Sequence, residues 1–581
     1  MTLSGVPVFG RQFFASGEPF ARIGSGSLGG KAKGLVGIHE ALRARFGSDP
    51  CAPIEVTIPA SVVITTEVFD AFMGRNRIKP AELTRLSDER ISHLFLQADF
   101  PVEFLGDLRA LAEEVRVPLA LRSSSLLEDA LYRPFAGVYG TKMIPNDQPD
   151  QDARFRKLIE VIKYVYSTTY FGAARAYRET AADDPHGEKM AVLIQEIVGE
   201  RHGDRFYPTV SGVARSFNYY PFPPARREEG VVNLALGLGK TIVDGGVSWI
   251  YSPAHPAAPP PYGSLRDLLT GTQLHFWAVG MGRPREHNPI AETEHLVRAH
   301  LQDADYDGTL KWVASTYQAG VDRIVLGTAT PGPRVLNFGP LLILDDIPFN
   351  STVREMLTVC EQAMESPVEI ELALNLPRRG SAGARLGFLQ VRPMVVSNEE
   401  IEVQAGEMAA PETVIASSKV LGNGRRAPIR DIVYVRPEAF DARLTSTLVG
   451  QIAARNTELV QQGRRYLLIG FGRWGSADPW LGIPAQWGHI SGACVIVEAM
   501  LSSMNIEFSQ GSHFFHNLSS FGVSYFSVPH TGGARIDWDW LNSQEACWES
   551  ELVRHVRLDE PLEARVDGRT GRGVISRTGA A

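Results

Sequence analysis

Apolar positions follow two different periods along the first 400 residues of the chain. In residues 31–46 (KAKGLVGIHEALRARF) apolar side chains recur every three or four positions, which predicts an amphipathic helix. The glycine-rich run before this segment supplies the turn into the helix. Residues 61–65 (SVVIT) instead form a short continuous apolar run, which predicts a buried strand. We therefore expect a fold that mixes helices with strands.

The same two patterns continue along the chain and define the expected fold class, α/β in the broad sense that includes α+β. Residues 253–263 (PAHPAAPPPYG) should form a surface loop, because proline fits the interior of neither a helix nor a sheet. The further elements expected are helices at 68–73 and 155–177, and strands at 119–122, 190–197, 230–238, 368–374 and 387–391.

The length of 581 residues exceeds what a single hydrophobic core usually serves, which predicts at least two domains. An acidic, alanine-rich stretch after residue 398 is typical of a linker. Beyond it we expect strands at 432–435 and 466–469 and a partly helical segment at 484–504. The expected parts are a first domain at 1–398, a linker at 399–414, a C-terminal mixed α/β domain of unknown type at 415–560 and a disordered tail at 561–581.

Composition excludes several classes of protein. The chain has 58 Lys and Arg against 66 Asp and Glu, so its formal charge of -8 gives no general attraction to nucleic acid or anionic lipid. No run of eighteen apolar residues occurs, and the first twenty residues lack a basic segment followed by an apolar one. We therefore expect no signal peptide, no membrane span and no membrane partner. Four widely spaced cysteines suggest neither a zinc site nor a disulfide framework, and they suit a cytoplasmic protein.

Two glycine-rich segments are candidates for phosphate binding. The run GSGSLGGK at 24–31 ends in Lys31 at a helix start, where backbone amides and the ammonium group could converge on an anion. A dinucleotide-binding interpretation fails because no hydrophobic strand precedes the run, whereas a simple glycine-rich turn remains an alternative. The second segment, LGLGKT at 236–241, imitates the end of a P-loop but has Leu234 where the first glycine is required.

Charged residues on two predicted strands are candidates for phosphate and metal binding. Arg122, followed by three serines, could grip phosphate oxygens, or it could pair with Glu128 or Asp129. Glu369 and Glu371 lie two positions apart and so share one face of their strand, as ligands of Mg²⁺ would. The alternative is that these glutamates belong to the solvated face of an amphipathic strand.

Taken together and in this order, these segments resemble the N-terminal ATP-binding domain of phosphoenolpyruvate synthase and pyruvate phosphate dikinase, which has an ATP-grasp-like fold. The matching segments are GGK at 29–31, IP and ITT at 58–66, RSS with ED and FAG at 122–137, SGVA at 211–214, GLG at 237–239 and QVRP at 390–393. Lys240 stands where the family has a glutamate, so we do not transfer that glutamate's role.

The resemblance implies a site for ATP and Mg²⁺ that extends over roughly the first two thirds of the chain. The segment 190–198, which contains Gln195, is similar to the strand that holds adenine in the family. The residues implied to contact the nucleotide are Lys31, Arg122, Gln195, Gly237, Gly239, Glu369, Glu371, Gln390 and Arg392, and those implied to hold the metal are Glu369, Glu371 and Gln390.

The family's phosphohistidine swivel, with its TSHA sequence, and its long β/α barrel are not recognisable here. About 180 residues follow the first domain, fewer than a β/α barrel requires, so we do not expect complete conversion of pyruvate by this chain alone. Three hypotheses therefore stay open. They are an ATP-dependent phosphotransferase that acts on a histidine or an unidentified acceptor, a noncatalytic ATP-responsive module, and the ATP subunit of a split synthase whose swivel or substrate domain is a separate chain.

The C-terminal third has two segments rich in glycine, aromatic residues and histidine, at 470–480 and 509–517. Arg473 between glycines could bind an anion, and His513 or His516 could accept a phosphoryl group in place of the missing swivel histidine. We therefore place Lys31, Arg122 and His513 in catalytic roles. The alternative is that the aromatic residues, Trp474 and Trp480 among them, are core and that the histidines only donate and accept hydrogen bonds.

Overall fold

The computed structural model describes most of the chain, in two compact units that are treated separately below. The described residues are 5–47, 52–126, 128, 137–181, 188–219, 221–258, 265–282, 286–377, 383–394, 401–476, 478, 480–501, 518, 521–530, 533–568 and 570–578. Unit 1 comprises residues 1–216, 228–242 and 247–393, and unit 2 comprises residues 217–227, 243–246 and 394–581.

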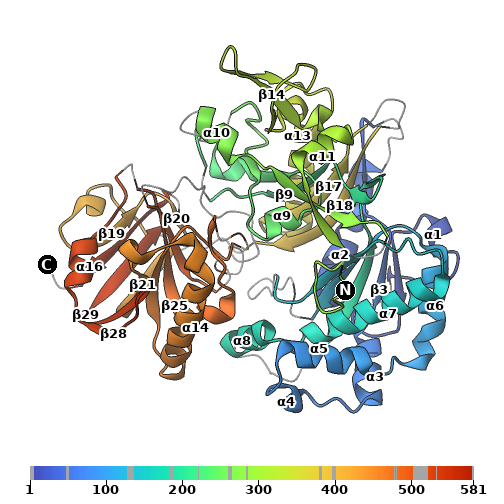
Figure 1. Ribbon diagram of the computed structural model, residues 1–581, viewed down its shortest axis with the longest axis horizontal. Helices are drawn as coiled ribbons and strands as arrows, with labels where there is room; N and C mark the ends of the chain where they lie inside the picture. The colour runs from blue at the N-terminus through green and yellow to red at the C-terminus, as the bar shows by residue number, and fades with distance from the viewer. Residues whose placement is uncertain are drawn as a thin grey trace. The chain divides into compact units, whose positions relative to one another are not determined.

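The first sheet of unit 1 is a five-stranded sheet covered by helices (Figure 1). Helix α2 (Gly29–Phe46) packs against its strands β4 and β6, and α7 (Gln151–Thr168) packs against β4, β5 and β6. In spatial order the strands are β1 (Phe20–Ile23), β3 (Ser61–Ile64), β6 (Met190–Glu196), β4 (Leu119–Ser125) and β5 (Thr141–Ile144). The other helices of this region are α3 (Thr66–Arg75), α5 (Asp88–Gln97), α6 (Leu105–Glu114) and α8 (Gly172–Ala181).

A six-stranded second sheet of unit 1 has one apolar and one polar face. Ile370 and Leu372 point to a core shared with Leu35 of α2, whereas Glu369 and Glu371 point to the opposite face. Because of this alternation, one face of the sheet packs against the core and the opposite face carries charged side chains. In spatial order the strands are β11 (Trp249–Tyr251), β10 (Val231–Ala235), β9 (Val210–Arg215), β17 (Val368–Asn375), β18 (Ala384–Pro393) and β2 (Ile54–Thr57).

Two smaller sheets and several helices complete the described part of unit 1. One sheet contains β13 (Leu296–His300), β12 (His275–Gly280), β8 (Arg205–Tyr207) and β7 (Glu200–His202), and the other contains β15 (Arg323–Leu326), β14 (Ala314–Gln318) and β16 (Arg334–Leu336). The helices are α1 (Phe13–Ser16), α4 (Pro80–Leu83), α9 (Lys240–Val243), α10 (Leu265–Gly271), α11 (Leu301–Tyr306), α12 (Gly339–Ile343) and α13 (Phe349–Met364).

Unit 2 is built on a large mixed sheet with parallel strands on one side and antiparallel strands on the other. The neighbours β21, β22, β25 and β26 run parallel, and helix α14 (Thr445–Gln461) connects the first two of them. In spatial order the strands are β20 (Val420–Leu421), β26 (Ser524–Val528), β25 (Ala493–Ala499), β22 (Tyr466–Phe471), β21 (Gly424–Val435), β29 (Val553–Asp567), β30 (Arg572–Arg577), β19 (Thr413–Ser417) and β27 (Arg535–Ile536). The remaining elements are β28 (Ala546–Glu549), which pairs with β29, the short pair β23 (Arg473–Trp474) and β24 (Gly482–Ile483), and α16 (Trp538–Ser543).

The strands and the first helices expected from the sequence are present, but several other expectations are wrong. The helix expected at 155–177 is interrupted between α7 and α8. In the segment 484–504, which was expected to be partly helical, the described residues 484–501 contain strand β25 and one 3-10 turn (Trp487–His489). The tail expected to be disordered forms the end of β29 and all of β30, where Ile575 is buried. Val403, inside the expected linker, is likewise buried in a small cluster with Ala416 and Val574.

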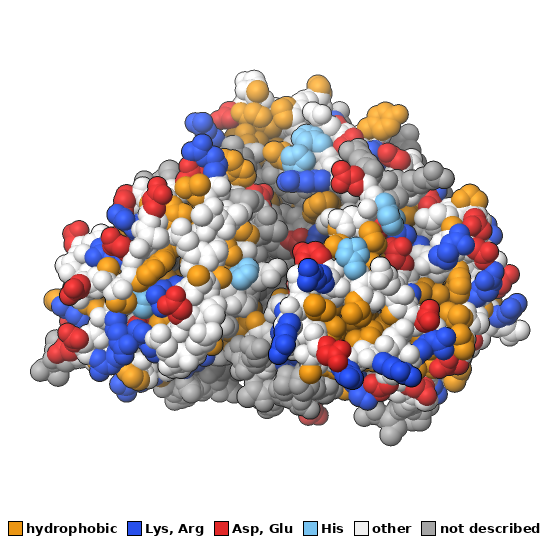
Figure 2. All heavy atoms as spheres, turned by 60° about the horizontal axis from the view of Figure 1, so that its bottom comes forward, with side chains coloured by type: hydrophobic (Ala, Val, Ile, Leu, Met, Phe, Trp, Pro, Cys, Tyr) orange, Lys and Arg blue, Asp and Glu red, His pale blue; other side chains and the backbone are white. Residues whose placement is uncertain are grey.

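The surface carries charges of both signs. Figure 2 shows basic and acidic side chains interspersed over the face of the molecule that it presents. Among the described residues, none of the helices combines the length and the apolar character that crossing a membrane requires.

Candidate functional site

The double glycine before Lys31 is required by the close approach of two backbone segments. Gly29 begins α2 with a φ of +76°, and a Cβ atom placed on it would lie 1.6 Å from the carbonyl oxygen of Ser124. A Cβ on Gly30 would lie equally close, at 1.6 Å, to the carbonyl oxygen of Glu128. Only glycine lets the start of α2 lie against the loop that follows β4, and this contact fixes the position of Lys31.

Lys31 is buried in a hydrogen-bonded cluster with residues of that loop. Its Nζ forms an ion pair with Glu128 Oε1 and donates to Ser123 Oγ at 3.3 Å. Ser123 Oγ in turn donates to Glu128 Oε1 at 2.9 Å, and Glu128 Oε2 accepts from the backbone amide of Ser125 at 2.9 Å. The charge of Lys31 is therefore balanced by Glu128 in this conformation.

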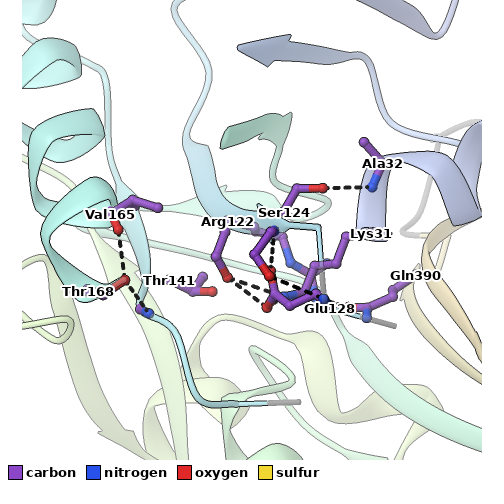
Figure 3. Close-up of polar contacts among 12 residues, drawn as sticks. Lys31, Ala32, Arg122, Ser124, Glu128, Thr141, Val165, Thr168 and Gln390 are labelled. Carbon is purple, nitrogen blue, oxygen red and sulfur yellow. Dashed lines mark hydrogen bonds and ion pairs between the residues drawn. The ribbon is translucent and has the colours of Figure 1, made fainter. Parts of the chain in front are cut away.

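Ser124 fixes helix α2 to strand β4. Its hydroxyl donates to the carbonyl oxygen of Leu28 at 2.8 Å and accepts from the amide of Ala32 at 3.1 Å, a contact drawn in Figure 3. The amide of Ala32 is one of those at a helix start that have no partner within the helix. The serines of the motif therefore hold the protein's own groups together, and they place Lys31 beside Arg122.

The loop at 24–27, which the sequence suggested as an anion cradle, is bound by the start of helix α3. The amide of Ser25 donates to Glu67 Oε2 at 2.5 Å, and the amide of Ser27 donates to Thr66 Oγ1 at 2.9 Å. The hydrogen bonds from the hydroxyl and the amide of Ser25 lower the pKa of Glu67. These amides already have protein acceptors, so this structure favours the turn interpretation for the first half of the glycine run.

Arg122 joins the two large sheets of unit 1. It lies on β4, and its NH2 group donates to Glu371 Oε2 at 2.7 Å and to Gln390 Oε1 at 2.6 Å. The NH1 group donates to the carbonyl oxygen of Leu389 at 3.3 Å. Arg122 thus contacts β17 and β18, whereas Glu128 pairs with Lys31. Figure 3 shows Lys31, Arg122, Glu128 and Gln390 close together.

Glu369, two residues before Glu371, lies in a buried network with two arginines. Its side chain is 1% exposed, its Oε2 accepts from Arg215 Nε at 2.5 Å, and its Oε1 forms an ion pair with Arg392. The strand register explains why these three residues meet, because Glu369 lies opposite Arg215 on β9 and opposite Arg392 on β18. The solvated-face interpretation is therefore wrong for Glu369.

The network at the polar face of the second sheet, which includes Arg122 from the first sheet, contains more arginines than glutamates. Three arginines, Arg122, Arg215 and Arg392, contact two glutamates, Glu369 and Glu371. Guanidinium groups donate in a fork that suits phosphate oxygens. This surface is therefore chemically suited to an anionic ligand that carries phosphate.

The remaining expected nucleotide contacts lie around this face. Gln195 is buried on β6, where its Nε2 donates to Ser61 Oγ at 3.3 Å, and its register places it on the same side of the first sheet as Arg122. Gly237 has a φ of +79°, and its carbonyl oxygen accepts from Ser211 Oγ at 2.7 Å. Gly237 and Gly239 follow β10, which lies two strands from Glu371.

The oxygen ligands of Glu369, Glu371 and Gln390 are of the type that Mg²⁺ prefers. Among the described residues, however, no group of three His, Cys, Asp or Glu side chains is arranged to hold a metal ion. Both oxygens of Glu369 are paired with arginines, while Glu371 and Gln390 share one NH2 group of Arg122. The donor set fits the metal in kind, and Glu371 and Gln390 both contact a single arginine, whereas Glu369 contacts two.

A comparison with protein families decides the assignment. The profile of the pyruvate phosphate dikinase AMP/ATP-binding domain matches residues 25–413, about two thirds of the chain. The chain belongs to this family. The matched range holds every residue of the network around Arg122 and Glu369. Membership makes this region an ATP-binding, phosphotransferase-like domain with an ATP-grasp-like fold. A comparison with curated proteins gave no match.

The sequence did not predict the observed partners of two residues in this network, Arg215 and Glu128. Arg215 follows the SGVA segment at the position where the family's S-G-V-A-F has phenylalanine, and this departure was the available signal. Glu128 was considered as part of the matching ED segment and as a possible partner for Arg122, yet it pairs with Lys31. The candidate acceptors His513 and His516 lie outside the described residues, as does Asp129.

The other C-terminal candidates have structural roles. Arg473 is buried, and its NH1 group donates to the carbonyl oxygens of Gly245 and Gly246 at 2.9 and 3.3 Å. Trp474 is a core residue whose Nε1 donates to the carbonyl oxygen of Val497 at 3.1 Å. Trp480, in contrast, is 71% exposed, so the expectation that it belongs to the core is wrong.

Proposed function

We propose that the protein is an ATP-dependent phosphotransferase in which Arg122 is the principal phosphate ligand. The observation that carries this proposal is the placement of its guanidinium between two sheets, against Glu371 and Gln390. Phosphoryl transfer is catalysed mainly by positioning and charge neutralisation, and a guanidinium beside two metal-type oxygen ligands supplies both.

Lys31 and Arg392 would add positive charge on either side of Arg122. Lys31 is paired with Glu128 in this conformation, so it would reach a phosphate only by exchanging that partner. Arg392 is held by Glu369. Mg²⁺ would be held by Glu371 and Gln390, with Glu369 beside them, and would neutralise charge on the bound phosphates. Gln195, Gly237 and Gly239 would line the rest of the nucleotide site.

The acceptor in this proposal is a histidine of the chain, with His513 as first candidate, or a separate substrate such as pyruvate. The test is incubation of purified protein with Mg²⁺ and ATP labelled separately at the β and γ phosphates. Nucleotide products and acid-labile label on the protein are then followed. We expect consumption of ATP and label on the chain that is lost in Glu371→Gln.

Two variants make the test specific. His513→Ala distinguishes a histidine relay, since it should abolish label on the chain while ATP still binds. Arg385→Gln is the matched control, because Arg385 lies on β18 with Gln390 but forms an exposed ion pair with Glu55. The control should retain full activity.

A noncatalytic, ATP-responsive module is the second candidate, and Lys240 favours it. Lys240 begins helix α9 directly after Gly239, where the family has a glutamate. Tight binding of ATP without consumption, with pyruvate and cell extract also supplied, would contradict the phosphotransferase and support this module. Turnover only after a second polypeptide is added would indicate a split synthase.

A further inference from the structure

Unit 2 contains a cysteine, a histidine and an aspartate in contact, in a part of the chain outside the ATP-binding family match. Cys547 is an exposed residue on β28, and its Sγ lies 3.3 Å from Nδ1 of His555 on β29. The other ring nitrogen of His555, Nε2, lies 2.9 Å from Oδ1 of Asp431 on β21. The three side chains thus form a chain from the surface thiol to a buried carboxylate.

The hydrogen bonds determine which nitrogen of His555 can accept a proton. An ionised carboxylate only accepts hydrogen bonds, so the hydrogen of the neutral ring lies on Nε2 and is donated to Asp431. Nδ1 then presents its lone pair to the thiol of Cys547. This is the order of nucleophile, base and orienting carboxylate that activates cysteine for acyl transfer.

Asp431 is held in its ionised form by two donors. Arg464 contacts both of its carboxylate oxygens, with Nε at 3.0 Å from Oδ2, and His555 contacts Oδ1. Burial alone would raise the pKa of Asp431, but the hydrogen bonds from His555 and Arg464 lower it. The ionised carboxylate of Asp431 fixes the orientation of the His555 ring through this contact.

The local backbone presents the thiol outward. The pairing of β28 with β29 shifts register between Ala546 and Trp548, so Cys547 lies at an irregularity of the ladder. Such bulges redirect a side chain and are frequent beside active sites. Cys360 and Cys494 are also free thiols, and Cys360 is buried. Cys494, which is half-buried and lies in unit 2, is the control cysteine for the reactivity of Cys547.

Other groups around the thiol act in both directions. The pKa of the Cys547 thiol is raised, chiefly by burial and by the charge of Asp431, although Arg464 and Arg455 act to lower it. The thiol also lies 3.4 Å from the carbonyl oxygen of His555, a second acceptor for its proton. If the thiol donates to this carbonyl oxygen, it gains no reactivity, whereas if it donates to Nδ1 of His555, it is activated. The experiment below distinguishes these two cases.

We propose that Cys547 is a nucleophile that accepts acyl groups from activated esters or thioesters, with His555 as its proton acceptor and Asp431 as a positioning residue. The thiol proton moves to His555 Nδ1, and the sulfur electron pair attacks the carbonyl carbon. The bond from that carbon to the leaving oxygen or sulfur breaks, and the leaving group takes the proton from Nδ1. The product is an S-acyl Cys547.

The test uses the full chain and p-nitrophenyl acetate as the probe. We expect a burst of about one p-nitrophenolate per chain and one added acetyl group, which peptide mass spectrometry places on Cys547. Cys547→Ser should lose the burst, while Cys494→Ser should retain it. Absence of a burst in the parent protein, or a burst that persists in Cys547→Ser, would overturn the proposal.

The pH dependence of the reaction tests the role of His555 without requiring a buried substitution. With base assistance, acetylation of Cys547 should stay fast at pH 7, well below the ordinary pKa of a thiol, about 8.5. His555→Gln should slow the reaction at pH 7 by about 100-fold, the lower range for general base catalysis, and Asp431→Asn should shift the profile. A profile that simply follows thiol ionisation in the parent protein would contradict the proposal even if the variants fail to fold.

Discussion

The two ends of the charged face in unit 1 differ, although their glutamates lie only two residues apart. At one end, Glu369 is paired through both carboxylate oxygens with Arg215 and Arg392, all within one sheet. At the other end, Glu371 shares Arg122 with Gln390, and Arg122 comes from a different sheet. The contacts of Glu369 with its two arginines lie within one sheet, whereas the second network joins two sheets through one side chain.

This difference separates a structural role from a ligand-binding one. A buried carboxylate between two guanidinium groups cannot be removed without leaving uncompensated charge. A guanidinium shared by a carboxylate and an amide can exchange a partner for a phosphate at lower cost, because Glu371 and Gln390 have oxygens that a metal ion would use. We therefore infer that the Glu369 end maintains the sheet and that the Glu371 end binds the nucleotide.

The largest effect on stability should come from Glu369→Gln. Glutamine has one acceptor oxygen where glutamate has two, so one of the two guanidinium groups is left facing an NH2 group. We expect a loss of about 3–5 kcal/mol in the free energy of unfolding of unit 1, measured by urea denaturation. Glu55→Gln, which breaks the exposed pair with Arg385, is the control and should cost about 0–1 kcal/mol. If Glu369→Gln and Glu55→Gln lowered the free energy of unfolding equally, the buried network would contribute no more to stability than the exposed ion pair, contrary to this prediction.

In unit 2, Asp431 lies in a similar network with Arg464 and His555. Removing its charge should lower the free energy of unfolding by an intermediate amount that depends on pH. The folded pKa of Asp431 is lowered, so its stabilising contribution is present above the unfolded value of about 3.9 and is lost as pH falls through the folded pKa. Asp431→Asn should cost about 1.5–3 kcal/mol at pH 7, and the difference from the parent protein should narrow below about pH 4. The measurement is denaturant unfolding at several pH values.

The control for that experiment is Asp539→Asn, because Asp539 is an exposed residue on α16. Its difference from the parent protein should be small and should not change with pH over this range. A gap for Asp431→Asn that stays constant down to pH 3 would show that the carboxylate charge is not what stabilises unit 2.

The smallest stability effect should come from Glu371→Gln. The amide oxygen can still accept from Arg122, so this hydrogen bond loses its charge but not its acceptor, which should cost about 1 kcal/mol. We expect the urea midpoint to change much less than in Glu369→Gln while ATP consumption falls. A stability loss as large as that of Glu369→Gln would place both glutamates in structural roles.

Local patterns were enough to predict the helix and strands that present the candidate site. Apolar periodicity located α2, β3 and β4, and alternation on β17 placed Glu369 and Glu371 on one face. The antiparallel pairing of β17 with β18 then brings Gln390 opposite Glu371. These features depend on residues close together in the sequence or on the pairing of consecutive strands, so local sequence patterns are enough to predict them.

The partners of the charged residues depend on contacts between distant segments. Arg122 and Glu371 are 249 positions apart, and a nearby acid, Glu128, was an equally acceptable partner for Arg122 on sequence grounds. The C-terminal strand β30 was mistaken for a disordered tail because its glycines and arginines hide a short apolar run. Its stability comes from pairing with β29 and β19, which no local window contains.

The most direct test of the account is the affinity for ATP of the parent protein and of Arg122→Lys, measured by titration calorimetry with Mg²⁺ present. Lysine keeps the charge but lacks the planar fork of five donors with which Arg122 can contact Glu371, Gln390 and a phosphate from fixed directions. We predict that Arg122→Lys weakens binding about 10-fold to 100-fold, equivalent to about 1.4–2.7 kcal/mol, while Arg385→Gln binds as the parent protein does. Unchanged affinity in Arg122→Lys would contradict the central claim that this arginine, between the two sheets, holds the phosphates of the nucleotide.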